Sequence, residues 1–81
     1  MRRPTHTAVC WWLDAWSRDQ DDEPAGPERG YVRVWSGLLV QDDEHGVCLV
    51  KGWDPEDQTG SHKSFIPRGM VRRLLRYKIN W

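Results

Sequence analysis

Apolar and β-branched residues gather in short runs separated by turn-forming residues, a pattern typical of small all-β proteins. The clearest runs span 31–40 and 47–53, and they flank a polar Asp-Asp-Glu-His-Gly segment at 42–46. We expect these two runs to pair as a β-hairpin in which Gly46 takes a left-handed backbone conformation. We also expect a bend or bulge near Gly37, because glycine weakens a regular strand.

The N-terminal run 7–16 is open to two interpretations. Its β-branched and aromatic residues, and the adjacent pair Trp11 and Trp12, favour a strand. A helix is the alternative, because four apolar residues recur at helical spacing. They are Val9, Trp12, Leu13 and Trp16.

The C-terminal part reads as strand, tight turn and strand. The first strand is expected at 62–66 and the second at 71–79. Pro67 fixes its own φ, and Gly69 can adopt backbone angles that other residues resist, so the chain is expected to turn between the strands. A helix over 70–79 is again the alternative, since Met70, Val71, Leu74 and Leu75 also fit helical spacing.

The segment 17–30 carries Asp, Glu, Gln, Pro and Gly with almost no apolar residue, which predicts a long exposed acidic loop. Loops longer than about 12 residues are usually functional or disordered. The whole chain, 1–81, is short enough for one domain. We therefore predict a mainly β protein: one small five-stranded antiparallel barrel with a long acidic loop after its first element.

Composition adds an excess of aromatic surface and no net charge. Six tryptophans are present, and 12 basic residues balance 12 acidic residues. Most of the tryptophans are expected in the core, with one or two left on the surface as a contact patch. Acidic clusters precede a basic C-terminal part, but a neutral chain has no net field that draws it to polyanions.

Several classes of function find no support in the residues. Two cysteines make no disulfide framework, and the sequence shows no secretory or transmembrane run, so we expect a reduced, cytoplasmic protein that does not enter a membrane. The cysteines and histidines lack close ligand spacing, so neither a metal nor a cofactor is expected. His62 beside Ser61 and Ser64 is a chance arrangement rather than a catalytic one, and no enzyme activity is predicted.

The segment Ser-Phe-Ile-Pro-Arg-Gly-Met-Val at 64–71, preceded by Gln-Thr-Gly at 58–60, resembles the end of a Src-homology-three-type barrel. The resemblance covers roughly the last 35 residues and implies a small barrel fold in which Pro67 could line a groove. The aromatic residues with which that family binds proline-rich peptides are missing. The strand order also resembles Sm-like barrels, whose subunits join edge to edge into rings but whose nucleic-acid-binding motifs are absent here.

The combined observations predict a non-catalytic interaction module that binds a protein partner, or itself, through exposed aromatics and a basic C-terminal strip. By analogy with small phage proteins, such a module could antagonise a larger bacterial defence machine. Binding of nucleic acid or a nucleotide is the alternative, with arginines on phosphates and aromatics on bases. The residues expected to bind the partner are Trp35, Trp53, Arg68, Arg72, Arg76, Tyr77, Lys78 and Trp81.

Overall fold

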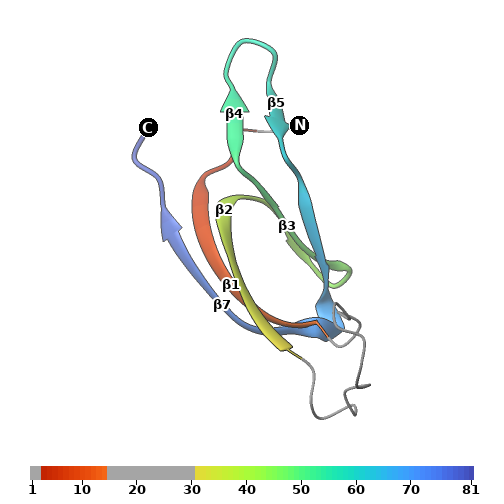
Figure 1. Ribbon diagram of the computed structural model, residues 1–81. Helices are drawn as coiled ribbons and strands as arrows, with labels where there is room; N and C mark the ends of the chain where they lie inside the picture. Colours follow the sequence, from red (N-terminus) through yellow and green to blue (C-terminus); the bar gives the residue numbers. More distant parts are fainter. Residues whose placement is uncertain (1–2, 15–30) are drawn as a thin grey trace.

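The computed structural model describes residues 3–14 and 31–81, and these form seven strands and one short 3₁₀ helix (Figure 1). The predicted acidic loop at 17–30 lies outside the described residues. The elements are β1 (His6–Asp14), β2 (Tyr31–Asp43), β3 (Gly46–Val50), β4 (Gly52–Asp54), β5 (Thr59–Ser61), β6 (Ser64–Pro67), η2 (Arg68–Met70) and β7 (Val71–Lys78).

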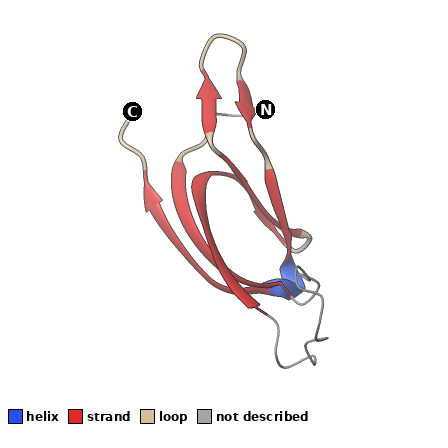
Figure 2. Ribbon diagram, viewed as in Figure 1, coloured by secondary structure: helices blue, strands red, loops and turns tan. Residues whose placement is uncertain are grey.

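Five of the strands form one antiparallel sheet in the order β6-β3-β2-β1-β7. The other two, β4 and β5, form a separate hairpin that extends from the sheet (Figures 1 and 2). The predicted mainly β, five-stranded antiparallel class is confirmed. Strands are also confirmed over the helical alternatives for both β1, as far as Asp14, and β7.

The prediction of a closed barrel is not met. Within the described part of the chain, hydrogen-bonded pairing stops at β6 on one edge and at β7 on the other. β6 and β7 are joined by the 3₁₀ helix η2 and do not pair with each other. β6 pairs with β3, and β7 pairs with β1 at the opposite edge of the sheet.

The two glycines singled out in the sequence have different roles from those expected. Gly69 has no positive φ, and a methyl group at its Cα would meet nothing within 4 Å, so the turn does not depend on glycine there. Gly46 does have a positive φ, +157°, which lies far from the left-handed helical value. Its main constraint is close approach, because a Cβ would lie 2.3 Å from the carbonyl oxygen of Ile66.

The core lies on the concave inner side of the curved sheet. β2 makes this curvature, because it pairs with β1 over its first part and with β3 over its second part, with an irregularity between Leu39 and Gln41. The predicted bend thus falls a few residues after Gly37. The buried cluster consists of Ala8, Cys10, Trp12, Val47, Leu49 and Ile66.

Candidate functional site: the outer face of the sheet

β1 has one buried side and one partly exposed side. Ala8, Cys10 and Trp12 point inward and are at most 8% exposed. The intervening residues, Val9 and Trp11 among them, point to the opposite side and are only half-buried. Successive side chains of a strand alternate between faces, so β1 brings an apolar row to the outside as well as to the core.

The neighbouring strands extend this row into a surface. Residues directly opposite each other on paired strands share a face, so the registers of β2 and β7 on β1 define what lies beside the outward row. We name this surface the outer face. It consists of Thr7, Val9, Trp11 and Leu13 of β1, Val32, Val34, Ser36 and Leu38 of β2, and Arg73, Leu75 and Tyr77 of β7.

The outer face is apolar and accessible. Val32 is 59% exposed, Val34 53% and Tyr77 54%. Small monomeric proteins rarely expose contiguous apolar patches larger than a few hundred Å² unless a partner covers them. The outer face is therefore a candidate contact surface.

One charged residue belongs to this described face. Arg73 lies opposite Trp11 on the paired strand, and its guanidinium carbon is 5.1 Å from the centre of the Trp11 ring. At this cation–π distance the ring attracts the guanidinium. The outer face thus contains one cation, Arg73, and no carboxylate, and Lys51 lies at its border beside Ser36 and Leu38.

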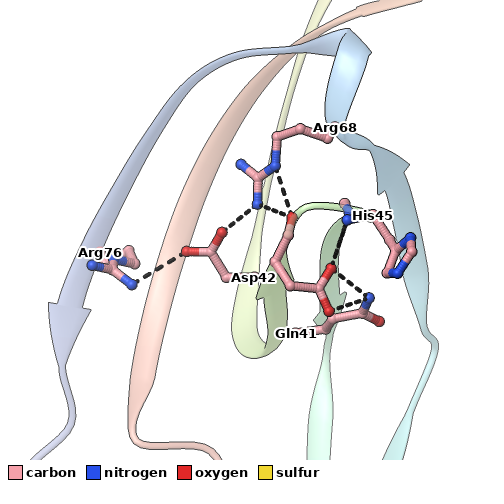
Figure 3. Close-up of polar contacts among 7 residues, drawn as sticks. Gln41, Asp42, His45, Arg68 and Arg76 are labelled. Carbon is pink, nitrogen blue, oxygen red and sulfur yellow. Dashed lines mark hydrogen bonds and ion pairs between the residues drawn. The ribbon is translucent and has the colours of Figure 1, made fainter.

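The basic residues expected to form a strip are divided between different contacts. Figure 3 shows two of them, Arg68 and Arg76, beside Asp42. Arg68 of η2 forms an ion pair with Asp42 and donates two hydrogen bonds to the carbonyl oxygen of Asp43, at 2.9 and 2.7 Å. Arg76 of β7 reaches the other carboxylate oxygen of Asp42 at 3.2 Å. Asp42 therefore ties η2 and β7 to the end of β2, and its one negative charge is shared by two of the predicted binding cations.

The remaining two basic residues lie apart from that cluster. Arg72 donates to the carbonyl oxygens of Gly69, at 3.1 Å, and of Val71, at 3.5 Å. Lys78 is exposed at the end of β7, opposite His6. The structure thus does not bring Arg68, Arg72, Arg76 and Lys78 together as one uncommitted basic strip.

The predicted aromatic residues also lie in different places. Trp35 points inward and packs edge-on against Trp12, with ring centres 4.6 Å apart. Trp53 lies on the β4–β5 hairpin. Trp81 is 57% exposed, but its indole N–H donates to the carbonyl oxygen of Pro4 at 2.8 Å. Of the predicted residues, Tyr77 alone belongs to the outer face.

Sequence reasoning missed Trp11, Val32, Val34 and Arg73. The signal lay in β1, where apolar residues occur at both odd and even positions, so both faces of the strand are largely apolar. β1 is also a central strand that pairs with β2 and β7. A strand of this kind is covered on both faces or leaves one apolar face open. Of the described residues, none forms a second layer over the outer row of β1.

Asp43 organises the β2–β3 turn beside the Asp42 cluster. Its Oδ1 accepts hydrogen bonds from the backbone N–H of His45, at 2.9 Å, and of Gly46, at 3.2 Å. The Gln41 side chain donates to the same carboxylate. Chiefly the Gln41 bond, and then the backbone bonds, hold the pKa of Asp43 below its ordinary 3.8.

We expect Asp43→Ala to lower the free energy of unfolding at neutral pH. We also expect the free energy of unfolding of the variant to fall less than that of the wild type as the pH is lowered. A carboxylate with a lowered folded-state pKa stabilises the fold well above pH 3.8, and this contribution is lost as the pH falls from there through the folded pKa. Urea unfolding at about pH 7 and about pH 3 measures the effect. An equal difference between wild type and variant at both pH values would contradict the role given to Asp43.

The other chemistry-bearing groups of the described residues make no alternative site. Burial raises the pKa of the Cys10 thiol above its ordinary 9.0, which keeps the thiol protonated and unreactive at neutral pH. Across residues 3–14 and 31–81, no three His, Cys, Asp or Glu side chains gather where they could hold a metal. The same residues include no helix of the length and apolarity needed to cross a membrane.

Comparison with known proteins finds no matching family, no matching curated protein and no matching solved structure.

Proposed function

We propose that this protein is a non-catalytic interaction module that binds a protein partner through the outer face of β2, β1 and β7. The observation that carries the proposal is the open apolar row of β1, flanked by the exposed Val32 and Val34 on one side and Tyr77 on the other. Tryptophan, tyrosine and arginine dominate the energetics of protein interfaces, and this face holds one of each.

Charge indicates what kind of partner fits. Arg73 stands among apolar neighbours, so a matching surface would be apolar with a carboxylate opposite the guanidinium. A second copy of the chain fits less well. Two identical outer faces joined about a two-fold axis would bury two guanidinium groups, and the face supplies no carboxylate to pair with either.

Nucleic-acid binding receives less support. Arg68 and Arg76 share Asp42, so part of the cationic charge expected to meet phosphates is already compensated within the chain. The outer face itself contributes Arg73, with Lys51 at its border. Salt-dependent binding to single-stranded oligonucleotides would be the result that favours this alternative.

The test is affinity capture from the native lysate with a variant that charges the outer face. Val32→Lys with Val34→Lys places two ammonium groups on an apolar contact, and we expect capture of the partner to fall at least tenfold, or by about 1.4 kcal/mol. Gln58→Lys with Thr59→Lys adds the same charge on the exposed β4–β5 hairpin and serves as the matched control.

The control variant should retain the partner, and quantitative mass spectrometry of the captured proteins compares the two. Both pairs of substitutions are at exposed positions, so both variants should unfold near the wild-type urea concentration. The same proteins captured equally by the Val32/Val34 variant would contradict the proposal. The proposal would also be contradicted if light scattering showed that the wild-type protein is a dimer and that the Val32/Val34 variant is a monomer.

A further inference from the structure

β2 has two edges, and the edge that faces away from β1 is paired over only part of its length. It pairs with β1 from Tyr31 to Leu39, but its pairing with β3 begins at Leu38. Among the described residues, no strand pairs with 34–36 on the side away from β1, although β4 comes close to β2. A strand edge of this kind presents backbone N–H and C=O groups to any extended chain that reaches it.

A groove runs along this edge. Its cavity of about 430 Å³ lies between 34–36 on one side and the end of β3 with the segment before β6 on the other. Trp35, Leu49 and Val50 make its apolar part, whereas Lys51, His62 and Ser64 make its polar part. No acidic side chain lines the groove.

We infer that this groove accepts an extended acidic peptide segment of a protein partner as an added strand beside 34–36. The segment's backbone would hydrogen-bond to the open edge of β2, as in other cases of strand addition. An apolar side chain would enter the part formed by Trp35 and Leu49, and a carboxylate would face Lys51. Charge complementarity selects an acidic segment, since the groove has a cation and no anion.

This site goes beyond the function proposed above, because it uses the free edge of β2 and a groove. Two residues, Val34 and Ser36, belong both to the outer face and to the groove lining. Val34 is exposed at the border between them. One partner could meet both surfaces, but neither proposal requires the other. The experiment for the groove therefore uses a peptide and substitutes none of the residues that define the outer face.

The probe is a fluorescein-labelled hexapeptide of alternating glutamate and valine, titrated with the full-length chain and followed by fluorescence anisotropy. We expect saturable binding that Lys51→Glu weakens at least about tenfold, since it replaces the attracting cation with a like charge. Lys63→Glu is the matched control, because Lys63 is exposed nearby but does not line the groove, and binding should change much less.

A second pair of probes separates strand addition from charge attraction. Successive residues of a strand point their N–H groups to opposite sides, so only every second amide of the peptide faces β2. N-methylation of the amides that face β2 should abolish binding, whereas N-methylation of the other amides should not. Hydrogen exchange should slow at amides within 34–36 when the parent peptide binds.

Equal binding of both methylated peptides would overturn the inference, as would equal effects of Lys51→Glu and Lys63→Glu. Equal binding of a peptide with lysine in place of glutamate would also overturn it. So would light scattering that shows two copies of the chain paired through this edge in the absence of peptide. None of these outcomes bears on capture of a partner by the outer face.

Discussion

Gly46→Ala should destabilise the protein by about 3 kcal/mol or more, because the added methyl group has no space. Its Cβ would lie 2.3 Å from the carbonyl oxygen of Ile66 and 2.6 Å from the Phe65 ring. The first of these is a backbone atom of β6, which pairs with β3 at this position, so relief requires the two strands to part. Urea unfolding followed by tryptophan fluorescence measures the loss.

Gly69→Ala is the matched control for this substitution. The same methyl group meets nothing within 4 Å in η2, and the backbone there has no positive φ. We expect the free energy of unfolding to rise by about 0.4–1 kcal/mol, because alanine restricts the unfolded chain more than glycine does. Similar losses for the two alanine variants would show that the β2–β3 turn and η2 are wrongly described.

Trp12→Ala should cost about 3–5 kcal/mol, which is a large share of the roughly 4–12 kcal/mol expected for a domain of this size. Trp12 is 8% exposed and belongs to the buried cluster, and Trp35 packs edge-on against it. Removing the indole leaves a cavity and exposes the Trp35 ring. Thermal and urea unfolding should both show a strongly destabilised protein.

The adjacent Trp11 provides the control, because it points to the outer face and is only half-buried. Trp11→Ala should cost roughly 1–2 kcal/mol, since less apolar area returns to water. Trp12→Phe should cost less than Trp12→Ala, because it keeps an aromatic ring and removes an indole N–H that is buried without a hydrogen-bond partner. A larger loss for Trp11→Ala than for Trp12→Ala would mean that β1 has the opposite register.

The strand content of the fold could be predicted because local composition determines it. The runs that became β1, β2, β3 and β7 are rich in β-branched and aromatic residues and bounded by turn formers. That the sheet stays open could not be predicted, because closure depends on long-range pairing, and β7 pairs with β1 but not with β6. The resemblance to Src-homology-three-type and Sm-like barrels stays a prediction.

The candidate site was harder to predict than the fold. Residue type alone pointed to Arg68 and Arg76, but an acidic residue far away in the sequence, Asp42, engages both. Trp35 likewise turned out to face the core. Which tryptophan of the Trp11 and Trp12 pair faces outward depends on the register of three strands, and a single-residue shift exchanges the two faces.

The most direct test of the central claim, that a protein partner covers the outer face, is site-specific photo-crosslinking in the native lysate. A benzoylphenylalanine in place of Val32 samples the outer face away from the groove, and the same group in place of Glu56 samples the exposed β4–β5 hairpin turn. We predict a discrete adduct with one protein from position 32 and none from position 56. Adducts from position 56 without any from position 32 would contradict the account.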